Sequence, residues 1–311
     1  MPADRPPASD VPAKLDPTGH GFESLSLPAN GIAVHLARAG GGRPLLLLHG
    51  WPEFWLTWAR CMQRLQDRFQ LLAPDLRGFG ASDKPTTGPS RAAGPEVHAA
   101  DVLALLDHLK IARVGVVGHD VGAYVAQALA REHPERIAGL FFFNCPYAGI
   151  GRRWAEVSHL IEIWYQSFHQ MPFAAELVGS LRAACRIYVG HFLRHWARDP
   201  HAFDADLEAW VDNFMRPGNL QGGFDWYLSA AAARAAVIRE EVPPLPKIAL
   251  PTRVMWGRHD PILKADWVDR LGEFFQDPEV TIAEDAGHFV HYETPDAAAA
   301  AIAAFFDRVR W

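Results

Sequence analysis

The sequence predicts a globular protein of the α/β class, in which a mostly parallel central sheet carries helices on both faces and a helical cap is inserted. Continuous apolar runs are typical of strands covered on both faces, and they lie at residues 45–48, 69–73, 114–117 and 137–143. Helical patterns alternate with these runs near residues 54–66, 95–110 and 121–133, as in a parallel sheet flanked by helices. With 49% hydrophobic residues among 311, the chain can bury a large core, which excludes a disordered or fibrous protein.

Residues 1–22 are expected to form a mobile tail, because a segment rich in Pro, Asp and Ser cannot bury enough surface to offset its conformational entropy. Residues 23–39 follow as two half-buried strands, separated by the turn signal Pro28-Ala29-Asn30-Gly31. These two strands form a predicted hairpin ahead of the buried strands.

The alternation of strands and helices stops at Pro146. Residues 146–245 predict several helices dense in Trp, Tyr and Phe, without a recognisable strand. Strand signals return at residues 252–256 and 280–283, and a helix at 295–309 closes the chain. We therefore expect a core domain of residues 23–145 and 246–311, with residues 146–245 inserted as a helical cap. Ligands of open α/β sheets bind at the carboxyl ends of the strands, so catalytic residues are expected in those turns.

Charge and cysteine content narrow the function. The chain has 30 Lys and Arg against 36 Asp and Glu, a net charge of −6, which gives little basis for binding nucleic acid. Cys61, Cys145 and Cys185 are widely spaced, so neither a disulfide scaffold nor a thiolate zinc site is expected. No signal peptide or membrane span is apparent. We expect a soluble, cytoplasmic protein that acts on a small molecule, with no nucleic-acid or membrane partner; the sequence leaves the oligomeric state open.

The most specific motif is Gly118-His119-Asp120-Val121-Gly122, between a predicted strand and a predicted helix. It has the form of a nucleophile elbow, G-x-Nuc-x-G, in which small residues flank a sharp turn that lifts the central side chain above the sheet edge. The nucleophile would be Asp120. Taken alone, the motif also fits an aspartate that caps the following helix. The other motifs of the chain must decide whether Asp120 is a nucleophile or a helix cap.

Three further turns follow predicted strands. His49-Gly50-Trp51-Pro52 stands where a hydrolase core supplies an oxyanion-hole donor, and the backbone N–H groups of Trp51 and Val121 would converge on one oxygen of Asp120; a plain Gly-Pro turn is the alternative. Trp256-Gly257-Arg258-His259-Asp260 and Ala286-Gly287-His288-Phe289 place a carboxylate and an imidazole at later strand ends. The chain order of nucleophile, acid and histidine is that of an α/β-hydrolase.

Together these motifs resemble the α/β-hydrolase superfamily, and within it the epoxide hydrolase and dehalogenase branch, closest to the epoxide hydrolases. The resemblance covers nearly everything after residue 22 and implies an α/β-hydrolase fold with Asp120 as nucleophile and no cofactor or metal. An ionised carboxylate can attack a saturated carbon without a base. The alkyl ester so formed would be hydrolysed by water that His288, oriented by Asp260, activates.

Ring opening needs a donor to the epoxide oxygen, and the resemblance implies that two cap tyrosines supply it. Gly223-Phe224-Asp225-Trp226-Tyr227 resembles the late-cap motif of the epoxide hydrolases, and Trp164-Tyr165-Gln166-Ser167-Phe168 the early-cap one. The alternative for either tyrosine is a core position with a satisfied hydroxyl. We expect Trp51, Trp164, Tyr165 and Tyr227 to bind the substrate, a small apolar or aryl epoxide, because an aromatic wall offers no fixed charge for an anion.

Two other functions stay open. A haloalkane or haloacetate dehalogenase would need a halide donor, for which Trp51 or Trp164 are candidates, although the tryptophan or arginine expected after the nucleophile is replaced by Val121. A non-catalytic ligand-binding protein on the same fold is the third interpretation.

Several polar residues receive no catalytic step. His191 and His195, with Asp199 beyond, are more simply a solvated helix face than a metal site, because a fixed third ligand is missing. We place His291 and Glu284 on the loop around His288, treat His119 as a polar elbow residue, and exclude Asn144 as the triad acid because it is not an acid.

Overall fold

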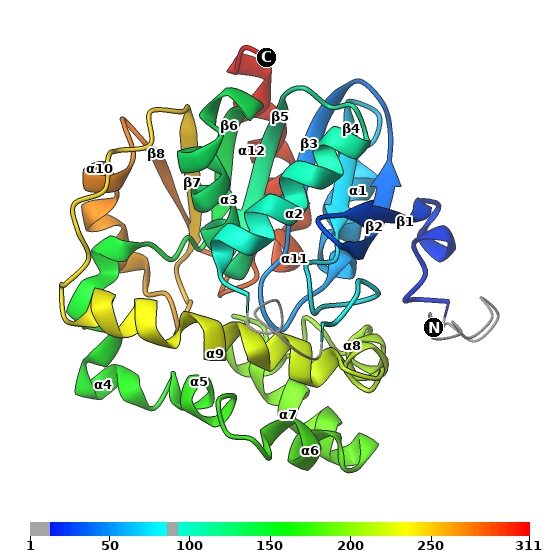
Figure 1. Ribbon diagram of the computed structural model, residues 1–311, viewed down its shortest axis with the longest axis vertical. Coiled ribbons are helices and arrows are strands. Elements are labelled where there is room, and N and C mark those ends of the chain that lie inside the picture. The colour runs from blue at the N-terminus through cyan, green and yellow to red at the C-terminus, as the bar shows by residue number, and fades with distance from the viewer. Residues whose placement is uncertain (1–12, 86–92) are drawn as a thin grey trace.

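A sheet of eight strands occupies the centre of the computed structural model, which describes residues 13–85 and 93–311 (Figure 1). The strand order is β1-β2-β4-β3-β5-β6-β7-β8. The bounds are β1 (Glu23–Ala29), β2 (Ile32–Ala39), β3 (Arg43–Leu48), β4 (Phe69–Pro74), β5 (Val114–His119), β6 (Ile137–Phe143), β7 (Thr252–Gly257) and β8 (Glu279–Ala283). β2 pairs antiparallel with β1 and β4, and every other pairing is parallel. The predicted α/β class is confirmed.

The β1–β2 hairpin turns where the sequence predicts. Asn30 and Gly31 join the two strands with φ angles of 46° and 79°, as a two-residue hairpin turn of the primed type requires. The pairing brings Ala29 opposite Ile32 at the turn.

Helices cover both faces of the sheet. α2 (Pro95–His108) packs beside α3 (Val121–Glu132) on one face, and α1 (Ala59–Leu65) packs beside α12 (Pro295–Arg308) on the other (Figure 1). All residues of β5 and β6 are buried, which explains their continuous apolar sequences. Two short helices, α10 (Leu271–Phe274) and α11 (Val290–Glu293), follow β7 and β8.

A helical segment separates β6 from β7 and lies below the sheet in Figure 1. Its α-helices are α4 (Val157–Leu160), α5 (Trp164–Phe168), α6 (Ala174–Gly179), α7 (Arg182–His195), α8 (Leu207–Phe214) and α9 (Asn219–Ile238). Trp210 Nε1 of α8 donates to the Pro52 carbonyl oxygen at 3.0 Å, which ties this segment to the turn after β3. Among the described residues, no helix combines the length and the apolar character needed to cross a bilayer.

Part of the expected N-terminal tail is packed against the core. Leu15 and Phe22 are buried at 3% and 4% exposure, Pro17–His20 form a 3₁₀ turn, and Trp55 Nε1 donates to the Leu15 carbonyl oxygen at 3.2 Å. The expectation of a mobile segment is therefore wrong for residues 13–22, because these apolar side chains find a hydrophobic surface. Residues 1–12 lie outside the described residues.

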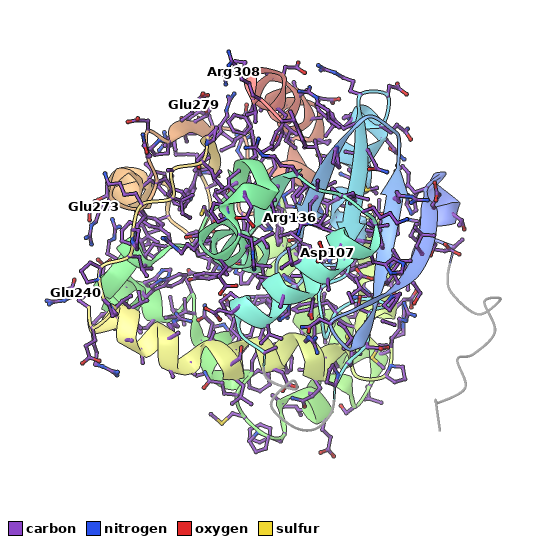
Figure 2. All side chains as sticks on the ribbon, turned by 45° about the horizontal axis from the view of Figure 1, so that its top comes forward. Asp107, Arg136, Glu240, Glu273, Glu279 and Arg308 are labelled. Carbon is purple, nitrogen blue, oxygen red and sulfur yellow. The ribbon has the colours of Figure 1, made fainter. Side chains whose placement is uncertain are left out.

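Ion pairs lie mostly at the periphery. Asp107 pairs with Arg136, and Glu279 pairs with Arg308, both at 2.8 Å and at the surface of the molecule (Figure 2). Exposed pairs of this kind contribute about 0–1 kcal/mol each. The stability of the fold therefore comes from the buried apolar layers.

Candidate active site

Asp120 stands in the turn between β5 and α3, with φ 47° and ψ −112°. Few residues other than glycine adopt such a backbone conformation, so the surrounding structure must hold it. The two glycines of the motif are needed for space: a Cβ on Gly122 would lie 2.2 Å from the Leu48 carbonyl oxygen, and one on Gly118 2.9 Å from the Gly122 carbonyl oxygen. The G-x-D-x-G spacing thus produces the elbow predicted from the sequence.

One half of the predicted oxyanion hole is formed. The backbone N–H of Trp51 donates to Asp120 Oδ1 at 3.0 Å. Val121, the first residue of α3, is buried beside Asp120, yet among the described residues Trp51 is the hydrogen-bond donor to this carboxylate. Oδ1 is therefore held by the backbone, and Oδ2 remains for chemistry.

Asp260 and His288 meet at the ends of β7 and β8. His288 Nδ1 donates to Asp260 Oδ2 at 2.7 Å, and both side chains are fully buried. The N–H groups of Ile262 and Leu263 donate to Asp260 Oδ1 at 2.8 and 3.0 Å, while Asn144 Nδ2 donates to Oδ2. Because the carboxylate is fixed on both oxygens, it holds the imidazole in one orientation. Nε2 of His288 is buried without a hydrogen-bond partner among the described residues.

The charges around His288 determine its protonation. Burial lowers the pKa of the imidazole, but the Asp260 carboxylate, with smaller contributions from Asp120 and Glu53, more than compensates and raises this pKa to about 9. The ring is therefore protonated at neutral pH.

The loop that carries His288 is held by one carboxylate. Glu293 accepts hydrogen bonds from the backbone N–H groups of Arg198, Gly287 and Phe289, at 2.7, 3.0 and 3.1 Å. The first donor belongs to the helical segment and the other two flank His288. This contact fixes the position of the imidazole relative to the segment below the sheet.

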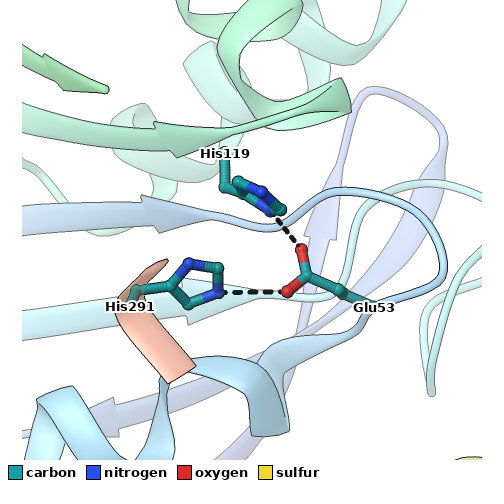
Figure 3. A group of neighbouring side chains, drawn as sticks. All are labelled: Glu53, His119 and His291. Carbon is teal, nitrogen blue, oxygen red and sulfur yellow. Dashed lines mark hydrogen bonds and ion pairs between the residues drawn. The ribbon is translucent and has the colours of Figure 1, made fainter. Parts of the chain in front are cut away.

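A buried carboxylate lies behind the nucleophile. Figure 3 shows Glu53 between two imidazoles, with Oε2 2.6 Å from His119 Nδ1 and Oε1 3.0 Å from His291 Nε2. Gly50 N–H donates to Oε2 at 2.8 Å, and the Thr57 hydroxyl donates to Oε1 at 2.5 Å. Burial would raise the pKa of Glu53, but its two histidine neighbours hold it well below its usual range. The Gly50 N–H and the Thr57 hydroxyl thus donate to a carboxylate that also contacts two imidazole nitrogens.

His119 links this carboxylate to the proposed base. Its Nε2 lies 2.9 Å from the backbone carbonyl oxygen of His288, which can only accept, so Nε2 carries a hydrogen. The ring therefore bridges Glu53 and the His288 loop. His291 belongs to α11 and is completely buried, so its expected place on a surrounding loop is wrong.

Glu53, His119 and His291 are also the described group of side chains best suited by residue type to hold a metal ion. Ligands in a tetrahedral site at about 2.0 Å from the metal keep their donor atoms roughly 3.3 Å apart. The 2.6 Å between His119 Nδ1 and Glu53 Oε2 is instead the length of a direct hydrogen bond. The three side chains form a hydrogen-bonded network that supports the elbow.

A cavity of about 220 Å³ opens above Asp120, and Tyr165 and Tyr227 line it. Tyr165 lies on α5 and Tyr227 on α9, with ring centroids 5.4 Å apart at an interplanar angle of 84°. Burial raises the pKa of both hydroxyls, and the Asp120 charge raises each further. Both hydroxyls therefore stay protonated and can donate hydrogen bonds into the space above Asp120. Gln166 Nε2 donates to the Tyr165 hydroxyl at 3.0 Å.

The two tryptophans expected to bind substrate do not line this cavity. The indole of Trp51 is 1% exposed and stacks on Tyr165, with centroids 5.3 Å apart and planes within 9°. It therefore supports the tyrosine from behind. Trp164 is 41% exposed and packs against Phe192, because its position on the short helix α5 turns it outward. The predicted substrate contacts of Trp51 and Trp164 are therefore not found in this cavity.

The arrangement has counterparts among known proteins. The family described as alpha/beta hydrolase fold matches residues 43–295. The chain belongs to the α/β-hydrolase fold family. It is 30% identical over 277 residues to the soluble epoxide hydrolase of Corynebacterium sp. (strain C12), covering 86% of this chain and 91% of that protein. It is 26% identical over 301 residues to epoxide hydrolase 4 of Homo sapiens, covering 94% and 81%.

Solved structures agree with this family. The structure of epoxide hydrolase CorEH without ligand matches 93% of this chain and 100% of its own, with a TM-score of 0.81 and 27% identity. The predicted family, its epoxide hydrolase branch and the prediction that this protein is a hydrolase are confirmed.

Sequence reasoning missed several residues of this hydrolase. Tyr124, Trp154 and Arg234 line the cavity, and Glu53 is the centre of the network behind the elbow. Glu53 directly follows the His-Gly-Trp-Pro turn, which is a signal that this glutamate lies near the elbow. Arg234 has no comparable signal, because it follows one serine and four alanines of a helix and resembles any exposed helical arginine in sequence.

Proposed function

We propose that this hydrolase converts an epoxide and water to a vicinal diol through a covalent ester on Asp120. One observation carries the proposal: a carboxylate at a nucleophile elbow and two protonated tyrosine hydroxyls line the same small cavity. A carboxylate suits attack on a saturated carbon, and paired O–H donors suit an oxygen that gains charge as it leaves. The epoxide hydrolase names of its relatives support the same activity.

The first step uses the free carboxylate oxygen. Oδ2 of Asp120 attacks an epoxide carbon, the C–O bond of the ring breaks, and its electron pair passes to the epoxide oxygen. Hydrogen bonds from Tyr165 and Tyr227 stabilise this developing alkoxide, which then takes up a proton from solvent. Oδ1 keeps its hydrogen bond from Trp51 and becomes the carbonyl oxygen of the ester.

The second step needs His288 in its neutral form. Formation of the ester removes the charge of Asp120, and this charge is one of those that hold the pKa of His288 at about 9. The pKa therefore falls when the ester forms, the ring releases its proton to solvent, and Nε2 can accept a proton from water. The hydroxide attacks the ester carbonyl carbon, and the Trp51 N–H stabilises the oxyanion. When this intermediate collapses, the ester C–O bond breaks and the hydroxyl proton passes to the leaving diol oxygen, so that Asp120 returns to the carboxylate and His288 keeps the proton taken from water. One oxygen of water remains on Asp120.

The proposal is tested with styrene oxide and a chloroalkane of similar size, with diol and chloride measured in parallel. We expect diol from the wild type and no turnover by Asp120→Ala, because Asp120 forms the covalent bond. In a single turnover in labelled water, the label should enter Asp120 before it enters the diol. Release of chloride without diol, or diol formation by a folded Asp120→Ala protein, would contradict the proposal.

The structure gives less support to the dehalogenase. Trp51 and Trp164, the two indoles considered as halide donors, lie outside the cavity lining.

A further inference from the structure

The cavity above Asp120 contains a cation that the reaction steps do not use. Arg234 of α9 is the single lysine or arginine among the described residues that line it. Two carboxylates share the lining: Asp120 on the elbow, and Glu96, which is exposed at the start of α2. The remaining walls are mostly aromatic and small apolar side chains.

Arg234 is held in place, and among the described residues it has no ionic partner. Its Cζ lies 4.7 Å from the ring centroid of Trp154, so the indole covers one face of the guanidinium. Nη2 is buried and donates to no acceptor among the described residues. Burial lowers the pKa of the Arg234 guanidinium. The neighbouring side chains of Tyr165, Tyr124 and Tyr227 partly offset this decrease.

Most other arginines between β6 and β7 differ from Arg234 because they have a carboxylate partner. They form ion pairs with carboxylates at the protein surface: Arg152 with Glu240, Arg153 with Asp269, Arg182 with Asp212, Arg186 with Glu208, Arg194 with Asp204, Arg198 with Asp285 and Arg239 with Glu241. An unpaired N–H edge on a buried cation is costly. Because Arg234 also lines the catalytic cavity, a ligand bound there can supply the missing anion.

A guanidinium presents two parallel N–H groups that match the two oxygens of a carboxylate. The cavity volume of about 220 Å³ equals roughly seven water molecules at about 30 Å³ each, which fits a compact aryl or short alkyl acid. We propose that the substrate is a small epoxide carrying a carboxylate, which Arg234 binds while the epoxide ring lies between Asp120 and the two tyrosines. This inference rests on the proposed epoxide hydrolysis and replaces the sequence-based expectation of a wholly apolar substrate.

The test compares two substrates that differ in one charge, para-carboxystyrene oxide and para-carboxamidostyrene oxide. For the wild type, kcat/KM should be about tenfold or more higher for the carboxylate, mainly through a lower KM, because hydrogen bonds between charged groups are about twice as strong as neutral ones. In Arg234→Met the ratio of the two kcat/KM values should fall to about one. Arg234→Lys keeps the charge without the two parallel donors, so its ratio should be intermediate.

Arg152→Met is the matched control. It removes the same charge from the same helical segment, but Arg152 is 74% exposed and pairs with Glu240 at the edge of the molecule (Figure 2). Its substrate ratio should equal that of the wild type. Equal kcat/KM values for the two epoxides in the wild type, or an unchanged ratio in Arg234→Met, would overturn the inference.

A binding experiment separates this inference from the proposed function. Calorimetric titration with para-ethylbenzoate and para-ethylbenzamide, which carry no epoxide, should show tighter binding of the carboxylate to the wild type but not to Arg234→Met. If both epoxides are hydrolysed with no preference and the two inert ligands bind equally, the anion site is wrong and the epoxide hydrolase stands. If the benzoate binds through Arg234 but no epoxide is hydrolysed, the proposed function and the epoxy-acid substrate fail together, and only an anion site remains.

Discussion

The floor and the roof of the catalytic cavity are built in different ways. The floor, at the strand ends, consists of charged side chains fixed by directional bonds: the carboxylates of Asp260 and Glu53 each accept bonds on both oxygens. The roof, formed by the helical segment, is held by stacked rings, such as His169 on Phe224 with centroids 3.8 Å apart, and Tyr165 of the roof stacks on Trp51 of the floor. Hydrogen bonds fix the angles between reacting groups, whereas stacking fixes mainly a distance. The floor is therefore suited to chemistry and the roof to substrate selection.

The largest expected effect tests the floor. His288→Gln should lower diol formation by about 10²–10⁴, the usual contribution of a general base, while Asp120 still reacts because it needs no base. Mass spectrometry should detect the alkyl adduct on the peptide that contains Asp120. His195→Gln, an exposed histidine paired with Glu162, is the control and should behave as the wild type. Absence of an adduct with a substrate that the wild type turns over would place His288 in the first step.

The next effect tests the roof. Tyr165→Phe and Tyr227→Phe should each lower kcat by up to about 10²–10³, the cost of losing one oxyanion-type donor, and the double variant should fall further. The two hydroxyls share one role, so a double-mutant cycle should show non-additive effects. Tyr188→Phe is the control, since its hydroxyl bonds to His169 rather than lining the cavity. Wild-type rates in both single variants and the double variant would remove the tyrosines from the mechanism.

The free energy of unfolding should also respond differently to substitutions in the floor and in the roof. Glu53→Gln removes the buried charge and places an amide NH₂ where the carboxylate accepts hydrogen bonds from Gly50 and Thr57, so the free energy of unfolding should fall by about 3 kcal/mol or more. Glu208→Gln, on the exposed outer side of the roof beside Arg182 and Arg186, should cost less than about 1 kcal/mol. Urea unfolding at neutral pH measures both. Similar losses for the two variants would show that the buried network contributes no more than a surface pair.

The smallest effect is a pH shift. Because the pKa of His288 is raised to about 9 in the folded protein from an unfolded value of about 6.5, its contribution to stability is complete below about pH 6.5 and is lost as pH rises through 9. Asp120→Ala removes one of the charges that raise this pKa, so an NMR titration of the ring should give a lower value. Asp285→Ala, an exposed carboxylate on the same loop, is the control. An unchanged pKa in Asp120→Ala would contradict the proposed coupling between ester formation and the base.

The floor could be predicted from the sequence and much of the roof could not. Asp120, Asp260 and His288 each stand a few residues after a buried strand, and the parallel sheet brings such turns together whatever the chain between them does. The sequence predicts that Trp51 and Trp164 bind the substrate, because their aromatic side chains suit an apolar wall. Adjacent positions on a helix point in directions about 100° apart, however, so a side chain next to a functional residue need not face the same cavity. The indole of Trp51 lies behind Tyr165, and that of Trp164 faces the surface.

Residues whose role depends on tertiary contacts cannot be recognised from the sequence. Arg234 lies in an alanine-rich helix, and only the packing of α9 over Asp120 turns it into a cavity wall. Residues 13–22 have a composition typical of a tail, and yet two apolar side chains suffice to anchor them. Composition averages over a segment, whereas packing depends on single residues.

The helical segment interrupts the sheet between β6 and β7, and this also orders events during synthesis. A growing chain emerges from its N-terminus and its parts can begin to fold before the rest is made, so Asp120 is available before Asp260 and His288 exist. Until β7 pairs with β6, through Leu140 beside Thr252, the apolar strand β6 presents an open edge that invites aggregation. A chain halted or cleaved within the helical segment would carry a nucleophile without its base. Such a fragment could be alkylated once and could not be regenerated.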